Sequence, residues 1–219
     1  MDYEDLLNKI ESSLKGNTPL DELSKIEYNP FKILISTILS ARTRDENTRK
    51  VTKKLFGRYT KPIQIANANI EELEKLVYET GFYKVKAARI KEVSKIIQEK
   101  HGGQVPSELK ELLELPGVGR KTANCVLAYA FKTPAIACDT HVHRISNRIG
   151  LVKTKYPEET EEELSKIIPK KLWIRINSIL VKFGQQICQP NNPKHNICPI
   201  EDICSKDFSM ENARKKKRK

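Results

Sequence analysis

The strongest constraint on the fold of this 219-residue chain is that its apolar residues recur at helical spacing almost throughout. Residues 31–41, FKILISTILSA, are almost wholly apolar, and Pro30 preceded by Asn29 is typical of a helix start. This segment is therefore expected to be a buried central helix. Residues 69–82, NIEELEKLVYETGF, place their apolar side chains in one stripe, with Gly81 expected at the C-terminal end of that helix.

The same periodicity predicts further helices over 107–115, 121–131, 140–149, 158–168 and 170–187. Little of the chain has the alternation of a β-strand, so the sequence predicts an all-α fold. A generic helical bundle fits this pattern equally well.

Charge and hydropathy narrow the classes of partner. Forty Lys and Arg against 28 Asp and Glu give a formal charge of +12, which favours a polyanion, either nucleic acid or an anionic membrane surface. No apolar run approaches the roughly 20 residues that cross a bilayer, and no signal peptide opens the chain. A soluble, cytoplasmic protein with reduced thiols is therefore expected, since the five cysteines do not have the pattern of a secreted disulfide framework.

Three of those cysteines lie in one short segment, CQPNNPKHNICPIEDIC, residues 188–204. Its soft or borderline ligands are Cys188, His195, Cys198 and Cys204, and its three prolines prevent a continuous helix. Such a loop buries little apolar surface, so a metal ion or cluster is a reasonable way to hold it. A solvated loop with incidental cysteines is the alternative.

The segment LPGVGRKTA, residues 115–123, lies between two expected helices. Gly117, Val118 and Gly119 can present successive amide N–H groups at a helix N-terminus, which is an arrangement that binds phosphate. Lys121 follows in the first turn, where the positive helix end should lower its pKa and favour a nucleophilic amine. Glycines that merely end a helix, and an ordinary surface lysine, remain open.

Downstream, CDTHVHRISNRIG places Asp139 just before another short helix. Asp139 is either an N-cap alone or a carboxylate that faces Lys121 and manages its proton. His141, Arg144 and Arg148 recur at helical spacing on one side, as a phosphate-binding face or as a solvated charged face.

Together, LPGVGRKTAN, DTHVHRISNR and the cysteine segment resemble endonuclease III of the helix-hairpin-helix DNA glycosylase superfamily, over most of residues 20–205. The resemblance implies a six-helix domain over 21–134, a cluster-bearing domain from 1–20 and 135–208, and an active site between them. Residues 209–219, which contain ARKKKRK, are expected to be a disordered basic tail that either strengthens DNA binding or has no function.

By this resemblance Lys121 is the Schiff-base lysine and Asp139 the catalytic aspartate of a bifunctional glycosylase and abasic-site lyase. Oxidised pyrimidines in double-stranded DNA are the implied substrates, and a monomeric, nucleoid-associated enzyme is expected. Two readings stay open, namely a mismatch or oxidised-purine glycosylase and a non-catalytic DNA-binding module.

The resemblance also implies DNA contacts by Gly117, Val118, Gly119, Arg144, Arg148 and Lys194. Arg42 and Phe82 fall where the family inserts a polar filler and an apolar wedge into the base stack. Relatives commonly carry glutamine and leucine there, so lesion preference is in doubt, and a core role for Phe82 is an alternative.

The family carries four cysteines at the spacing of the C-terminal segment, and His195 stands where its second cysteine belongs. A 4Fe-4S cluster held by Cys188, His195, Cys198 and Cys204 is therefore expected, because histidine can replace a thiolate on iron. A cluster without the histidine, zinc in a Cys3His site, or no metal remain as alternatives.

Overall fold

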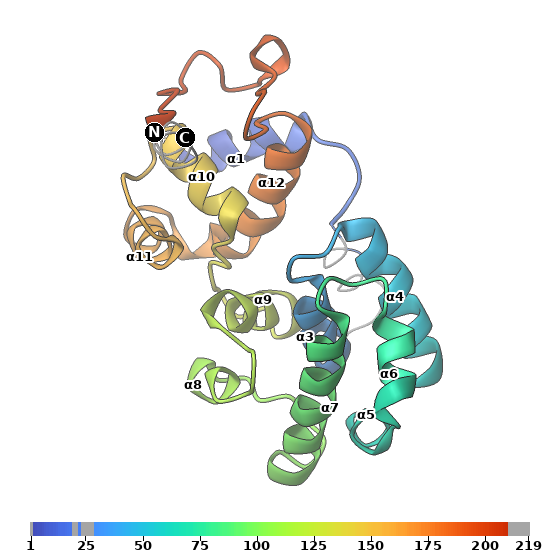
Figure 1. Cartoon of the computed structure of the whole chain (residues 1–219). Helices are drawn as coiled ribbons and strands as arrows, with labels where there is room; N and C mark the ends of the chain where they lie inside the picture. The colour runs from blue at the N-terminus through green and yellow to red at the C-terminus, as the bar shows by residue number, and fades with distance from the viewer. Residues whose placement is uncertain (1, 19–21, 23–28, 210–219) are drawn as a thin grey trace. The chain divides into compact units, whose positions relative to one another are not determined.

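The structure, a computed structural model, describes residues 2–18, 22 and 29–209. The chain divides into two compact units, Thr18–Thr133 and Met1–Asn17 with Pro134–Lys219. We call them the hairpin unit and the terminal unit and describe each by itself (Figure 1). Within the described residues the secondary structure is helical, without strands, which confirms the predicted all-α fold. The expected basic tail beyond Ser209 lies outside them.

The hairpin unit contains a run of helices that follow one another closely along the chain. They are α3 (Pro30–Ser40), α4 (Asp45–Arg58), α5 (Pro62–Asn67), α6 (Ile70–Val77), α7 (Tyr83–Lys100), α8 (Leu109–Leu113) and α9 (Arg120–Ala130). Helix α3 contacts α4, α7 and α9, and α7 also contacts α5 and α6. The core of this unit therefore forms around α3 and α7.

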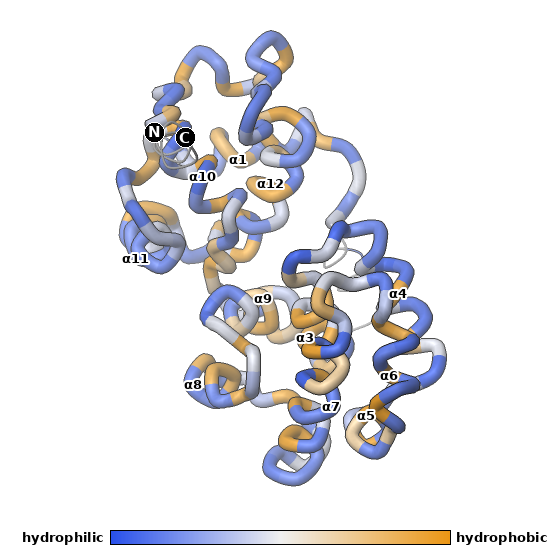
Figure 2. The backbone as a smooth tube through the Cα atoms, viewed as in Figure 1, coloured by the Kyte–Doolittle hydropathy of each residue, from blue (hydrophilic) through white to orange (hydrophobic). Residues whose placement is uncertain are grey.

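Helix α3 is the buried helix that the sequence predicts. Pro30 occupies its first turn, and the Asn29 side chain accepts a hydrogen bond from the Lys32 amide at 3.1 Å. Its residues from Ile33 to Leu39 are all buried. Figure 2 shows that α3 consists mainly of hydrophobic residues, whereas α4 is mostly hydrophilic. An apolar helix of this kind needs neighbours on most of its surface.

Gly81 has a different role from the predicted helix end. Helix α6 stops at Val77, and Gly81 is not among the residues with positive φ. A Cβ atom on Gly81 would instead lie 2.8 Å from the carbonyl oxygen of Arg42. The absence of a side chain thus allows two loops of the hairpin unit to approach closely.

The terminal unit joins the two ends of the sequence. Its elements are α1 (Tyr3–Ser12), α10 (Thr140–Arg148), α11 (Pro157–Ile167), the 3-10 turn η1 (Lys170–Leu172), α12 (Trp173–Gln186) and the 3-10 turn η2 (His195–Ile197). Helix α12 contacts α1 and α10, and α10 also contacts α11. Their shared core includes Ile10, Val142, Ile145 and Phe183, each at 0% exposure.

Within the described ranges, no helix combines the length and the apolar character needed to cross a bilayer.

Candidate functional site

The loop between α8 and α9 is a tight turn whose shape depends on Gly117. This residue has a φ of +74°, and an added Cβ would lie 2.0 Å from the Arg89 side chain of α7. The next residue, Val118, is 5% exposed, and its amide donates to the Leu115 carbonyl at 3.0 Å. A side chain at this position would strain the left-handed backbone and displace the Arg89 side chain.

Gly119 differs from Gly117 because it needs no unusual backbone. It is the N-cap of α9 with φ −87°, and because glycine has no side chain, no side-chain hydrogen bond caps the helix. A Cβ there would meet no atom within 4 Å, so the space beside it is open. An open helix N-terminus, with its backbone N–H groups and positive dipole end, can receive an anionic group such as phosphate.

Lys121 is the second residue of α9 and is half-buried. Every residue from Ala123 to Ala130 is buried, so the helix is enclosed on all sides after its first turn. This burial is broader than a single amphipathic stripe. Polar side chains of α9 are concentrated in its first turn, where Lys121 lies next to the glycine loop.

Asp139 is the N-cap of α10 in the terminal unit, whereas Lys121 belongs to the hairpin unit. Its Oδ1 atom accepts hydrogen bonds from the amides of His141 and Val142, each at 2.9 Å. Asp139 therefore has the N-cap role that was one of its two expected roles. Two amide bonds also fix the orientation of the carboxylate, which any catalytic use of it requires.

The neighbouring Cys138 is a poor nucleophile. Burial, with a further contribution from the Asp139 charge, raises the pKa of the Cys138 thiol far above its usual value. A thiol that stays protonated is inert, so Cys138 behaves as a small apolar core residue.

Arg42 and Phe82 are brought together, although they are 40 positions apart in the sequence. The Arg42 guanidinium carbon lies 5.6 Å from the centre of the Phe82 ring. Phe82 is 64% exposed, so it is not the core residue that remained an alternative. Both residues have positive φ, +51° for Arg42 and +58° for Phe82, which is uncommon for residues with side chains.

The prediction that Arg144 and Arg148 form a surface face on α10 is wrong. Arg144 is 7% exposed and Arg148 1% exposed. Arg144 donates to the Cys188 carbonyl at 3.0 Å, and Arg148 donates to the Gln189 carbonyl at 2.8 Å. Helical spacing alone does not reveal that a later loop covers this side of α10. These arginines bind the backbone of that loop and expose little surface to a DNA phosphate.

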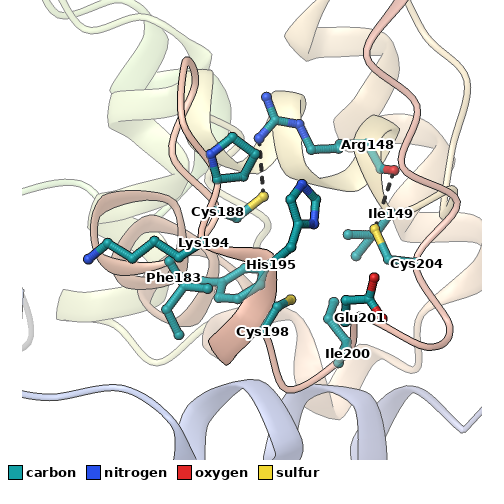
Figure 3. A pocket seen from close by; sticks show the side chains of 12 residues that line it. Arg148, Ile149, Phe183, Cys188, Lys194, His195, Cys198, Ile200, Glu201 and Cys204 are labelled. Carbon is teal, nitrogen blue, oxygen red and sulfur yellow. Dashed lines mark hydrogen bonds between the residues drawn. The ribbon is translucent and has the colours of Figure 1, made fainter.

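The loop that the arginines hold carries the cysteine segment. Cys188, His195, Cys198 and Cys204 line one pocket that is partly open to solvent, together with Arg148 and apolar side chains (Figure 3). All five cysteines of the chain are free thiols, and Cys188 is buried. The sequence segment therefore brings its four candidate ligands around a common space.

Hydrogen bonds to sulfur and burial shape the chemistry of this pocket. Arg148 Nη1 donates to Cys188 Sγ at 3.3 Å, and the Lys206 amide donates to Cys204 Sγ at 3.4 Å. Burial raises the pKa of the Cys198 and Cys204 thiols. Thiolates there would therefore need a cation to neutralise them, and N–H donors to sulfur are typical of iron–sulfur sites.

The four side chains are not drawn together as ligands of a single ion. In the described part of the chain, no three His, Cys, Asp or Glu side chains form a group arranged to hold one metal ion. His195 is exposed, and its ring lies 6.2 Å from that of Phe208 in an edge-to-face contact. Lys194 beside it is also exposed. By the chemistry of the donors alone, three sulfurs and one imidazole suit an iron–sulfur cluster or zinc, and a cluster links ligands that lie further apart than those of one ion.

Sequence reasoning missed Lys86, a buried lysine of α7 that contacts the loop of Arg42. A signal was present, because Lys86 falls on the same helical face as Ile90, Val93 and Ile97. A charged residue within an apolar stripe marks a position that needs polar partners.

Comparison with known proteins agrees with this architecture. A family model described as "HhH-GPD superfamily base excision DNA repair protein" matches residues 35–170. Endonuclease III of Thermotoga maritima is 57% identical over 178 residues, which cover 81% of this chain and 84% of that protein. Endonuclease III of Bacillus subtilis is 40% identical over 187 residues, covering 85% of each.

Solved structures give the same relationship. A non-covalent endonuclease III–DNA complex matches with a TM-score of 0.82 and 36% identity, covering 97% of this chain and 94% of that chain. A trapped endonuclease III–DNA covalent intermediate matches with a TM-score of 0.78 and 38% identity, covering 90% and 95%. The chain therefore belongs to the endonuclease III family within the HhH-GPD superfamily of base excision DNA repair proteins.

Proposed function

We propose that this protein is a bifunctional DNA glycosylase and abasic-site lyase that removes oxidised pyrimidines from double-stranded DNA. The observation that carries the proposal is Lys121, placed in the first turn of α9 directly after the Gly117–Gly119 loop. A DNA-binding hairpin needs the glycine loop but has no need of an amine at this point. The covalent intermediate known for a structural relative is consistent with a lysine nucleophile.

In the proposed reaction, neutral Lys121 Nζ attacks the anomeric carbon of a nucleotide turned out of the duplex. The bond from that carbon to the base breaks, and the base leaves with the electron pair and takes up a proton. Loss of a proton from the amine and opening of the sugar ring give an imine. Removal of a proton from the adjacent sugar carbon then expels the 3′ phosphate by β-elimination, and water releases Lys121.

Asp139 is proposed to stabilise the positive charge that develops on the sugar and to accept the proton of the amine. Its amide bonds to His141 and Val142 hold the carboxylate in one orientation. Pre-organisation of this kind reduces the reorganisation needed in the transition state.

DNA binding is proposed to use the backbone of Gly117, Val118 and Gly119, whose loop leads into the N-terminus of α9. Arg42 and Phe82 are proposed to fill the space that the extruded nucleotide leaves, because one is polar, the other is apolar, and both are exposed. Exposed Lys194 is proposed to contact the DNA backbone. A chromosomal substrate implies a nucleoid-associated protein.

We further propose that the hairpin unit and the terminal unit are the two domains of the family, the second carrying a 4Fe-4S cluster. Cys188, Cys198 and Cys204 would hold it with His195 as the fourth ligand. Such a cluster would link distant parts of the loop and supply a redox-active group. Arg148 would donate a hydrogen bond to one ligating sulfur.

Trapping with borohydride on a panel of lesions tests the proposed function. Borohydride reduces an imine to a stable amine, so a lyase that uses a lysine becomes covalently joined to its DNA. We expect trapped complexes with abasic and oxidised-pyrimidine duplexes. Excision of mismatched or oxidised-purine bases without trapping would contradict the proposal, as would duplex binding without any chemistry.

A further inference from the structure

Lys86 is an almost fully buried lysine that the proposed chemistry does not use. It lies in the first turns of α7, a helix that contacts α3, and is 4% exposed. Its Nζ donates three hydrogen bonds, to Leu39 O at 2.7 Å, to Ala41 O at 2.6 Å and to Thr43 Oγ1 at 2.7 Å. An ammonium group has three N–H donors, so this set of acceptors uses all of them.

The three acceptors fix the backbone on both sides of Arg42. Leu39 is near the end of α3, Ala41 immediately precedes Arg42, and Thr43 immediately follows it. A lysine at this place also stabilises the negative end of the α3 dipole. The left-handed backbone of Arg42 is therefore held between two residues that bind the same ammonium group.

Lys86 is also tied to Phe82. Its backbone amide donates to the Phe82 carbonyl at 3.1 Å, as part of the first turn of α7. Thr43 Oγ1, which accepts from Lys86, also accepts from the Gly81 amide at 3.3 Å. Gly81 in turn lies against the Arg42 carbonyl. One side chain thus connects the loop of Arg42 to the turn that presents Phe82.

The conformations at these two positions need such support. Among the described residues four non-glycine residues have positive φ, and Arg42 and Phe82 are two of them. Residues in this region of φ are disfavoured and persist where the surrounding structure holds them, often at functional sites. Here the result is an exposed guanidinium against an exposed aromatic ring.

The ammonium group is itself in an unfavourable place. Its three acceptors are neutral, and burial, with the nearby charge of Arg89, lowers the pKa of Lys86 to about 8. A pKa of about 8 is still above neutral pH, so most of the Lys86 side chains remain charged and keep their three donors. An apolar side chain would be easier to bury at this position. A function for the hydrogen bonds would explain this choice of residue.

We propose that Lys86 is a positioning residue that holds Arg42 and Phe82 together for insertion into duplex DNA. This inference rests on the proposed function, and specifically on the gap-filling role of the two side chains. It predicts that removing the ammonium group impairs steps that require an inserted pair. Steps on DNA without a base stack should be spared.

The test compares Lys86→Met with wild type on three DNAs: a duplex with an oxidised pyrimidine, a duplex with an abasic site, and a single strand with an abasic site. Methionine keeps an unbranched apolar side chain and removes the donors. We expect single-turnover excision from the lesion duplex to fall about tenfold, while trapping on the single strand changes by less than about twofold. Lys95→Met, an exposed lysine on the same helix, is the matched control and should behave as wild type.

A double-mutant comparison separates positioning from general damage. In the Arg42→Ala/Phe82→Ala background, Lys86→Met should slow excision by less than about twofold further, because the groups it positions are already gone. An equal loss on single-stranded and duplex DNA, or full multiplication of the effects in the combined variant, would overturn the proposal. So would a Lys86→Met protein that matches Lys95→Met on the lesion duplex.

Thr43→Val provides a second variant if Lys86→Met does not fold. It removes the hydroxyl that joins Lys86 to Gly81 but leaves two of the three acceptors. The same preference for duplex over single-strand loss is expected, at about threefold. Equal rates for Thr43→Val and wild type on the lesion duplex would refute the inference. Failure of the wild type to trap any abasic DNA would refute the proposed function instead.

Discussion

At the scale of single residues, Lys121 has the most direct consequence. Replacing it with glutamine removes the amine but keeps a helix-compatible polar side chain at the start of α9. Because the Gly117–Gly119 loop remains, Lys121→Gln should abolish borohydride trapping and leave duplex affinity within about threefold. Lys110→Gln on the exposed side of α8 is a control that should still trap. Trapping by Lys121→Gln at the wild-type level would remove Lys121 from the mechanism.

Asp139 combines a structural and a proposed chemical role, and two substitutions separate them. Asparagine caps helices as well as aspartate, so Asp139→Asn should keep the bonds to His141 and Val142 and change the free energy of unfolding by less than about 0.5 kcal/mol. Asp139→Ala should cost about 1 kcal/mol. Both should slow single-turnover excision at least about a hundredfold, if the carboxylate charge acts in the transition state. Normal excision by Asp139→Asn would leave only the cap.

At the scale of elements, the two glycines of the hairpin loop should differ. Gly117→Ala forces a Cβ onto a backbone with φ +74° and against Arg89, so the expected loss in the free energy of unfolding is about 1–3 kcal/mol. Gly119→Ala meets no atom and should cost less than about 1 kcal/mol. Chemical denaturation of both variants measures the difference. Equal losses would show that the loop is not held as described.

A second contact between elements joins helix α10 to the loop after α12 through the hydrogen bonds of Arg144. Arg144→Met removes the donor to the Cys188 and Gly184 carbonyls and should lower the free energy of unfolding by about 1–3 kcal/mol. Since Arg144 is 7% exposed, the salt dependence of DNA binding should not change. Arg175→Met, which removes an ion pair to Glu11 on the surface, is the control and should cost less than about 1 kcal/mol. A shallower salt slope, by about one unit, would make Arg144 a phosphate ligand after all.

At the scale of the whole molecule, the question is which metal group, if any, binds in the pocket of Cys188, His195, Cys198 and Cys204. With a 4Fe-4S cluster, purified protein should be yellow-brown and contain about four irons per chain. His195→Cys should retain the cluster at a lower potential, because thiolate adds negative charge, and His195→Ala should lose iron more readily in air. The measurements are the iron content and the visible spectrum of wild type, His195→Cys and His195→Ala, each prepared anaerobically. Colourless wild type with stoichiometric zinc would exclude the cluster, and an alanine variant as robust as wild type would exclude His195 as a ligand.

Local sequence patterns predicted many of the helices of this fold. The periodicity of residues 31–41 and the Asn29–Pro30 start predicted α3, and the glycine loop before Lys121 predicted the start of α9. Such features depend on residues within a few positions of one another, where helical spacing and capping act. The resemblance carried by LPGVGRKTAN and DTHVHRISNR likewise identified the family, because its motifs are local sequences.

Tertiary structure alone decided the environment of the charged residues. Arg144 and Arg148 have the spacing of a surface face, but the loop from Cys188 covers them and supplies carbonyl acceptors about 40 positions away. Lys86 likewise reaches carbonyls at the end of α3, and Arg42 lies over the ring of Phe82. The physical reason is that burial and hydrogen bonding depend on which segments pack together, and helical periodicity contains no information about contacts between distant segments.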